Sequence, residues 1–377
     1  MKSLGLSLLL LLPLFLLTSC GGGGDTPPPP PPPAATHFAY VSNADSSTIT
    51  AYSVNSATGA LVAVSGSPFG GVNGPLALAL APNSDFLAVG NLNGGGISVF
   101  RVSKTTGSLT AVANSPFSTG GSGFPARSLF HTTGNFFYAG LQLSPTNEIA
   151  GFSVDPSTGA LTPLPNSPFP GQPAIGGGGV NSLALHPSGN FLYASGSFQG
   201  IAGYSVDSAG NLTQLPGSPF AVAGAFPNST LVVHPSGNFL YMADFDADGV
   251  RVFPIASDGS LGGEIAGSPF FSGTGAKDLV LDLTGKFAYV INDGDSNVTA
   301  FRVDTNTGSL TFIGNTNTGL SPFGLTVDSS GKSLYVTNQS DGNVSACSIN
   351  SGTGALSPVA GSPFGAGDSP VSVVTTR

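Results

Sequence analysis

Three histidines stand at one position of a repeated turn and together resemble a set of zinc ligands. They share a short polar turn that ends in glycine, and they are His131, His186 and His234. Other copies of the turn have Ala81, Asp282 or Asp328 at this position. A side chain that accepts hydrogen bonds from the turn backbone accounts for His and Asp alike. We therefore expect these histidines to cap turns, and we predict no metal site from them.

A second candidate for metal binding is the acidic segment Asp244-Phe-Asp-Ala-Asp-Gly249, which has the carboxylate spacing of a calcium loop. The twelfth position of such a loop carries a bidentate glutamate, whereas here it is Ile255. Aspartate and asparagine are also favoured in hairpin loops for conformational reasons. We expect a hairpin loop, and calcium at Asp244, Asp246 and Asp248 is the less favoured alternative. No other cofactor is expected.

The N-terminal segment has the features of an export signal. Lys2 is its only basic residue, a leucine-rich stretch follows, and the segment ends in Leu17-Thr-Ser-Cys20. Leu-x-Ser-Cys resembles the bacterial lipobox, in which the cysteine becomes the acylated first residue of a lipoprotein. We predict a signal peptide over residues 1–19, and a lipidated Cys20 followed by a Gly- and Pro-rich tether over residues 20–36.

These features predict a position in the cell envelope. Gly21 follows the cysteine, and by resemblance to diderm lipoproteins this favours the outer membrane, on its periplasmic side or at the cell surface. The prolines at 27–33 extend about 3.1 Å each, so the tether holds the domain roughly 20 Å from the lipid. The net charge is −9 and no Lys/Arg cluster is present, which excludes nucleic acid as a partner. With Cys20 acylated, no disulfide can form within one chain, and we expect Cys347 to fill space in the core.

The elements that position these residues come from a repeat of roughly fifty residues. Each copy alternates apolar and polar residues around tight polar turns, which is typical of antiparallel strands. One column in the second strand of the copies holds Tyr40, Ala88, Tyr138, Tyr193, Tyr241, Tyr289 and Tyr335. Seven copies with four short strands each predict an all-β, seven-bladed β-propeller over residues 37–377.

The first and last copies are incomplete in complementary ways. Residues 37–43 read as a second strand with no first strand before it, whereas residues 369–375 read as a first strand with nothing after it. We predict that the C-terminal strand joins the N-terminal blade and closes the ring, which removes an exposed sheet edge. Ser-Pro-Phe follows the fourth strand in six copies and is missing near Asn315. Its proline is expected to end the outer strand, and its phenylalanine to fill the gap between blades.

The innermost strands are expected to meet around a central channel. Their predicted starts are Leu76, Ala126, Asn181, Ser229, Lys277, Phe323 and Val371. The next column along is more polar than its neighbours and contains Ala77, Arg127, Ser182, Thr230, Asp278, Gly324 and Ser372. A small polar ligand could bind there, and the residues that we expect to contact it are Asn181, Ser182, Asn228 and Thr230.

The motif Tyr335-Val-Thr-Asn338, together with the repeated His-Pro-Ser-Gly-Asn-Phe-Leu-Tyr at His186 and His234, resembles the seven-bladed lactonase-type propellers. That group includes 6-phosphogluconolactonase, carboxymuconate cyclase and YVTN surface-layer repeat proteins. The resemblance covers about residues 37–377. For enzymatic members it implies Gly-Pro-Arg-His before an inner strand and Asn-Glu-Leu after a second strand. The best matches here are Gly275-Ala-Lys-Asp-Leu279 and Asn292-Asp-Gly294.

The resemblance places Lys277 and Asp278 where the enzymes have arginine and histidine, and Asp293 where they have glutamate. Arg127 keeps the arginine of a second partial match, again without the histidine. In a lactonase, Arg127 or Lys277 would bind the anion, and Asp278 or Asp293 would act as the base. Alternatively, these charges pair with one another or solvate the channel mouth.

We favour an exported lipoprotein, expected to be a monomer, that binds a small polar ligand, a glycan or an envelope partner at the mouth of the channel. The alternatives are a lactonase with altered catalytic residues and a structural surface repeat protein.

Overall fold

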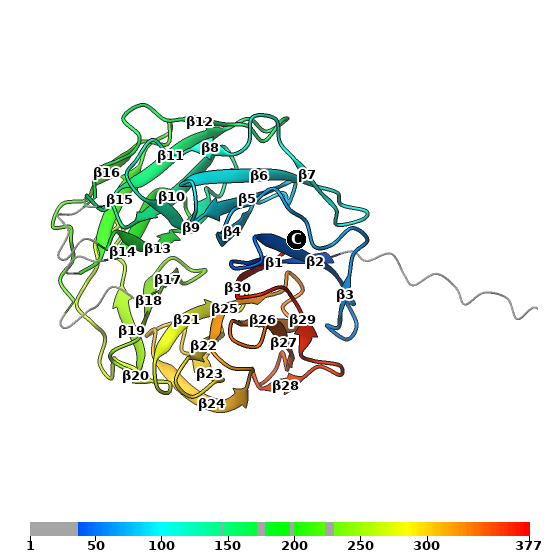
Figure 1. Ribbon diagram of the computed structural model, residues 1–377. Helices are drawn as coiled ribbons and strands as arrows, with labels where there is room; N and C mark the ends of the chain where they lie inside the picture. The colour runs from blue at the N-terminus through cyan, green and yellow to red at the C-terminus, as the bar shows by residue number, and fades with distance from the viewer. Residues whose placement is uncertain (1–36, 145, 172–177, 197–199, 223–229) are drawn as a thin grey trace, which may run out of the picture. The chain divides into compact units, whose positions relative to one another are not determined.

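The computed structural model describes residues 37–377 except 145, 172–177, 197–199 and 223–229. The predictions for Cys20 and Asn228 therefore fall outside the described residues. The described part of the chain is all β, and its strands form seven antiparallel blades arranged around a centre (Figure 1). Within it, no helix is long and apolar enough to cross a bilayer.

Each blade runs from an inner strand at the channel to an outer strand at the rim. The first blade contains β30 (Pro370–Thr375), β1 (His37–Asn43), β2 (Thr48–Val54) and β3 (Leu61–Ala63). The second contains β4 (Pro75–Leu80), β5 (Phe86–Asn91), β6 (Gly96–Val102), β7 (Leu109–Ala111) and the short β8 (Phe117–Ser118). The third contains β9 (Phe124–Phe130), β10 (Phe136–Gln142), β11 (Ile149–Val154) and β12 (Leu161–Pro163).

The remaining blades repeat this order. The fourth contains β13 (Val180–Leu185), β14 (Phe191–Gly196), β15 (Ala202–Val206) and β16 (Leu212–Gln214). The fifth contains β17 (Thr230–Val233), β18 (Phe239–Asp244), β19 (Gly249–Pro254) and β20 (Phe270–Phe271). The sixth contains β21 (Ala276–Leu281), β22 (Phe287–Asn292), β23 (Asn297–Val303) and β24 (Leu310–Asn317). The seventh contains β25 (Pro322–Val327), β26 (Ser333–Asn338), β27 (Asn343–Ile349), β28 (Leu356–Pro358) and the short β29 (Phe364–Gly365).

The ring closes as the two incomplete copies predicted. β30 is the inner strand of the first blade and pairs with β1, with Tyr40 opposite Val374. The Phe38 N–H donates to Thr376 Oγ1 at 2.9 Å, and the Thr376 N–H donates to the Phe38 carbonyl at 2.9 Å. The first blade is therefore built from both ends of the described chain. The pairing of β30 with β1 covers a strand edge that each would otherwise leave exposed.

The tyrosine column joins neighbouring blades. Each tyrosine is fully buried, and its hydroxyl donates to a turn-glycine carbonyl in the next blade at 2.7 to 3.1 Å. Burial raises the pKa of each phenol. The second blade has Ala88 in this column. There, Arg101 Nη2 donates to the Ser157 carbonyl of the third blade, and the guanidinium lies 4.7 Å from the centroid of Phe86.

The Ser-Pro-Phe motif interrupts the outer edge of six blades. The serine Oγ accepts a hydrogen bond from an N–H of the third strand, as Ser115 does from Val99 at 2.8 Å. The phenylalanine backbone then pairs with the start of that strand, as Phe117 does with Ile97. Phe117 also packs on a cluster shared by two blades, which confirms its expected filling role. The sixth blade lacks the motif, and its outer strand β24 continues for eight residues with one irregularity in its pairing, opposite Ala300 and Phe301.

The turn histidines cap turns, as predicted. In His131, Nδ1 accepts the Thr133 N–H at 3.2 Å, and Nε2 lies 2.9 Å from the Gly189 carbonyl of the next blade. His186 and His234 repeat both contacts. A carbonyl only accepts, so Nε2 carries the proton. Among the described residues, no three His, Cys, Asp or Glu side chains are close enough together to hold a metal ion.

Cys347 is the core residue that the repeat alignment predicted. It lies in β27, is 4% exposed and packs in a cluster between the sixth and seventh blades. Burial raises the pKa of its thiol to about 11, so it carries very little thiolate near neutral pH.

Candidate ligand site at the channel mouth

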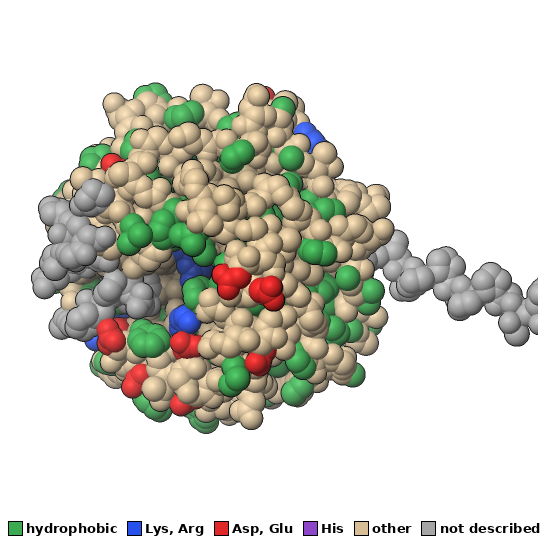
Figure 2. Space-filling view, viewed as in Figure 1, with side chains coloured by type: hydrophobic (Ala, Val, Ile, Leu, Met, Phe, Trp, Pro, Cys, Tyr) green, Lys and Arg blue, Asp and Glu red, His purple; other side chains and the backbone are tan. Residues whose placement is uncertain are grey.

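A cavity of about 380 Å³ opens where the inner strands begin. Figure 2 shows this hollow at the centre of the face, with Lys and Arg side chains inside it and Asp and Glu side chains beside it. Of the seven predicted strand starts, Ser229 lies outside the described residues, and the other six line the cavity, namely Leu76, Ala126, Asn181, Lys277, Phe323 and Val371. The other described residues that line it are Arg127, Gln142, Thr230, Phe245 and Asp293.

A bulge at one position of the inner strands presents these residues to the cavity. In the sixth blade, Ala276 pairs with Asn292 and Asp278 with Ile291, so Lys277 has no partner in the ladder. Asn181 is skipped in the same way between Val180 and Ser182. Equivalent irregularities occur in the first, second, third and seventh blades. An extra residue of this kind bends the strand and redirects its side chain, so the repeated bulge arranges residues around the mouth.

Lys277 is held by a carboxylate and by an aromatic ring. Its Nζ lies 3.3 Å from Asp293 Oδ2 and 4.3 Å from the centroid of Phe323. The two charged side chains are 22% and 26% exposed, so solvent screens the pair only in part. The contact with Phe323 is a cation–π interaction, which holds the ammonium group at the wall.

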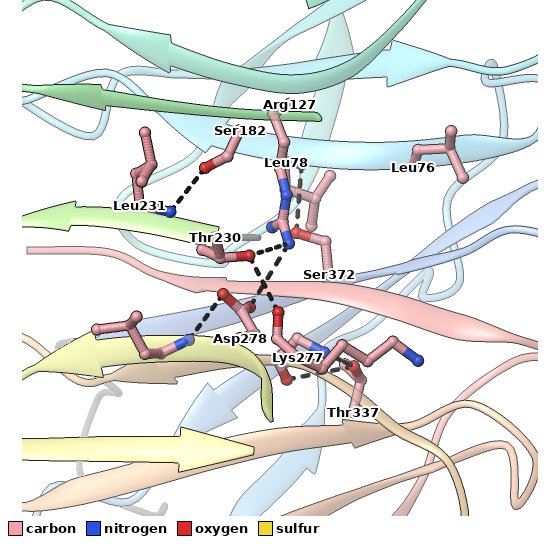
Figure 3. A network of polar contacts seen from close by, with 12 residues as sticks. Leu76, Leu78, Arg127, Ser182, Thr230, Leu231, Lys277, Asp278, Thr337 and Ser372 are labelled. Atoms are coloured by element: carbon pink, nitrogen blue, oxygen red, sulfur yellow. Dashed lines mark hydrogen bonds and ion pairs between the residues drawn. The ribbon is translucent and has the colours of Figure 1, made fainter. Parts of the chain in front are cut away.

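Arg127 reaches across the channel to the far wall. It extends from β9 of the third blade, and its Nη2 lies 3.8 Å from Asp278 Oδ2 on β21 of the sixth (Figure 3). The same nitrogen donates to Thr230 Oγ1 at 3.4 Å, and that hydroxyl donates to the Lys277 carbonyl at 3.1 Å. Thr230 thereby connects the two cationic residues of the mouth.

Asp278 is the most deeply buried of these charges, with its side chain 8% exposed. Burial raises its pKa above the ordinary value, whereas Arg127 and the backbone N–H groups of Leu279 and Leu325 act in the opposite direction. The Leu279 N–H donates to Asp278 Oδ1 at 3.0 Å. This carboxylate therefore has a structural role between blades in addition to any chemistry.

Ser182 and Ser372 have similar structural roles. The Leu231 N–H donates to Ser182 Oγ at 2.9 Å, and the Leu78 N–H donates to Ser372 Oγ at 3.3 Å. In each case the donor belongs to the inner strand of the next blade. An inner strand has one edge without a β partner, and these hydroxyls satisfy some of its N–H groups.

The structure separates the predicted site residues into two levels. Arg127, Lys277, Asp293, Asn181 and Thr230 line the mouth cavity. Asp278 and Ser182 line a second cavity of about 230 Å³, to which Arg127 and Thr230 also contribute. Asn181 Oδ1 accepts a hydrogen bond from Gln142 Nε2 at 2.8 Å.

Two lining residues were not predicted from the sequence. Gln142 stands four residues after Tyr138, as Asp293 stands four residues after Tyr289, so the column that contains Asp293 was the available signal. Phe245 stands at the same position after Tyr241, within the acidic loop Asp244–Gly249. Gly275 has a φ of 72°, and a Cβ there would lie 3.0 Å from the Phe245 ring, so glycine lets the ring pack closely.

Two carboxylates of that acidic loop, those of Asp244 and Asp248, have protein partners. Asp244 is fully buried, and its Oδ2 accepts a hydrogen bond from Arg251 Nε at 2.6 Å. Arg251 Nη1 also donates to Glu264 at 2.7 Å. Asp248 Oδ1 accepts the Gly275 N–H at 2.7 Å. The less favoured prediction of calcium at this loop stays a prediction.

Comparison with known proteins agrees with this architecture. The family model described as "Lactonase, 7-bladed beta-propeller" matches residues 34–124, 169–275 and 265–375. No curated protein matches the chain in sequence. A candidate 6-phosphogluconolactonase from Bacteroides fragilis is 22% identical, with a TM-score of 0.78 over 93% of this chain and 100% of that one. The periplasmic gluconolactonase of Pseudomonas aeruginosa is 21% identical, with a TM-score of 0.74 over 90% of this chain and 99% of that one. At these identities the two structures establish a shared fold only.

Proposed function

Because this chain belongs to the seven-bladed lactonase propeller family, we propose that it binds a small polar molecule at the channel mouth, as a lipid-anchored protein of the cell envelope. The observation that carries the proposal is the convergence of Arg127, Lys277, Asp293, Gln142 and Asn181 on one cavity. A glycan end or a polar group of an envelope protein would present similar chemistry.

The size and lining of the cavity support binding. Its volume of about 380 Å³ is near the lower end of the roughly 300–1,000 Å³ found for small-molecule sites. Such sites combine apolar walls with a few fixed polar groups. Here Leu76, Val371 and the ring of Phe245 supply apolar surface, while the ion pairs and amides supply donors and acceptors.

The proposed location rests on the sequence. The lipobox-like Leu17-Thr-Ser-Cys20 supplies the anchor, and the proline-rich tether keeps the propeller away from the lipid. The absence of aspartate after Cys20 favours the outer membrane in this proposal.

Calorimetric titration tests the binding proposal. The full-length protein in detergent is titrated with neutral monosaccharides, sugar lactones, sugar acids and short glycans. We expect saturable binding of at least one class, with about tenfold lower affinity in Lys277→Ala or Phe323→Ala, which corresponds to roughly 1.4 kcal/mol. Lys286→Ala, in a turn at the opposite end of the sixth blade, serves as the matched control. Binding that is absent from every class, or unchanged in both cavity variants, would contradict the proposal.

The second candidate function is hydrolysis of a lactone, favoured by the carboxylates and cations that meet at the mouth. Asp293 or Asp278 would take a proton from water as its oxygen adds to the lactone carbonyl. Lys277 or Arg127 would stabilise the oxyanion. The C–O bond of the lactone ring then breaks, and the protonated aspartate returns its proton to the departing alkoxide. The Pseudomonas protein is named as a periplasmic gluconolactonase, so an exported member with this fold is consistent with such chemistry.

A pH-stat assay with γ- and δ-lactones tests this candidate. Hydrolysis well above the buffer rate that falls at least a hundredfold in Lys277→Ala or Asp278→Ala would support it. Rates equal to the buffer rate for every lactone in the panel would show that the protein does not hydrolyse those substrates. If binding is also absent, a structural surface repeat is the remaining function.

A further inference from the structure

Each cation that lines the mouth cavity is paired with one carboxylate. Lys277 lies against Asp293 at 3.3 Å, and Arg127 faces Asp278 at 3.8 Å. Arg127 and Lys277 are the cations among its described lining residues. With all four groups ionised, their formal charges sum to zero. Sites that hold a phosphate or carboxylate instead present cations that are free to form charge-assisted bonds.

The binding of an anion is therefore disfavoured in two places, inside the cavity and at its rim. Inside the cavity it has to compete with Asp293 for Lys277, or with Asp278 for Arg127. Outside, exposed carboxylates occupy the loops that follow the second strands or precede the inner strand β30, namely Asp45, Asp246, Asp295, Asp341 and Asp368. Their field opposes the approach of a negative molecule at low salt and is screened over about 10 Å at 0.1 M.

A neutral molecule with many hydroxyl groups meets neither obstacle. Hydroxyls donate to Asp293 and accept from Lys277 without separating the pair. The amides of Gln142 and Asn181 add further donors and acceptors at the wall. One face of Phe323 is covered by the Lys277 ammonium, so Phe245 and the neighbouring aliphatic residues are the apolar surface for the C–H face of a ring.

We propose that the mouth cavity selects an uncharged, hydroxyl-rich ring, such as a neutral sugar or its lactone, against the phosphorylated or carboxylated form of the same molecule. The observation that supports this proposal is that Asp293 neutralises the charge of Lys277 and Asp278 neutralises the charge of Arg127. This inference rests on the proposed binding function and adds the charge class of its ligand.

The test compares the affinities of neutral and charged derivatives of the same sugar. Full-length protein is titrated at low salt with glucose, glucuronate and glucose 6-phosphate, and with the corresponding galactose and mannose series. We expect the neutral member of the best-bound series to bind at least tenfold more tightly than its charged forms, with a smaller ratio at 0.5 M salt. Asp293→Asn leaves Lys277 uncompensated, so we expect the ratio to fall at least fivefold in that variant.

Asp341→Asn is the matched control, because it makes the same change in formal charge on the exposed rim. We expect it to alter the ratio less than twofold. Tighter binding of a charged form by the wild-type protein would overturn the inference while leaving mouth-cavity binding intact. A ratio that responds equally to both substitutions would also overturn it, since net charge alone would then explain the selectivity. Failure of every series to bind in any charge form would contradict the binding function together with this inference.

Discussion

Arg127 Nη2 of the third blade lies 3.8 Å from Asp278 Oδ2 of the sixth, so one ion pair spans the channel between blades that are not neighbours in the ring. Thr230 of the fifth blade accepts a hydrogen bond from the same guanidinium. Both Arg127 and Thr230 line the mouth cavity and the second cavity. The pair therefore lies at the boundary between the two cavities.

The pair has a consequence for stability at different pH values. Burial raises the pKa of Asp278 above 3.8, so the folded protein binds this proton more tightly than the unfolded chain. The stability contributed by that proton is fully present below about pH 4 and is lost as the pH rises through the folded-state pKa. Asparagine cannot ionise. We expect the melting temperature of Asp278→Asn relative to wild type to increase between about pH 3.5 and pH 7.

Thermal unfolding of both proteins across that pH range checks this expectation. Thr326→Val, which changes another residue of the second cavity without a titratable group, is the control and should give a constant difference. If the melting temperature of Asp278→Asn relative to wild type stays constant or falls as the pH rises, the raised pKa of Asp278 is contradicted.

The tyrosine contacts between blades give a second prediction. Tyr241→Phe removes the hydroxyl that donates to the Gly308 carbonyl at 2.9 Å and leaves that carbonyl without its partner. We expect a loss of about 1–2 kcal/mol in the free energy of unfolding. Ser205→Ala, which removes a solvent-accessible hydroxyl bonded to the Thr213 carbonyl, should cost less than about 0.5 kcal/mol. Urea unfolding measures both, and equal losses would refute the special role of the tyrosine column.

Much of the fold could be predicted from the sequence because its determinants are local and repeated. The tyrosine column gave the number of blades, and the complementary ends at His37 and Thr375 gave the closure. The pairing of Phe117 with the third strand was not predicted, since it depends on the path of the chain after Ser-Pro-Phe.

The site could be predicted only in part. The repeat alignment placed Lys277 and Asn181 at the channel, because both stand at the same position of an inner strand. The alternative that these charges pair with one another is confirmed, but the sequence did not specify Arg127 with Asp278, because that pair depends on the length of a side chain across the channel. It also did not identify Phe245, because the position four residues after the column tyrosine changes in residue type between copies, with Gln142, Phe245 and Asp293 in three of them.

Lipid anchoring gives a third prediction. In Cys20→Ser the acyl acceptor is lost, so we expect no incorporation of labelled palmitate and a shift from the detergent phase to the aqueous phase on Triton X-114 partition. Cys347→Ser, a buried thiol in the propeller, should keep the label and the detergent partition. Unchanged labelling of Cys20→Ser would show that the lipobox interpretation is wrong.

Hydrogen exchange with a bound sugar tests the central claim most directly, because it reports where on the chain the ligand lies. The full-length protein is saturated with the neutral monosaccharide of highest affinity in the calorimetric panel, and amide exchange is followed by mass spectrometry. We predict slower exchange in β21, which carries Lys277, and in β25, which carries Phe323, with no change in the turns at His131 and His186 on the other end of the blades. Protection confined to those turns, or saturation with no change in β21 and β25, would contradict a ligand site at the channel mouth.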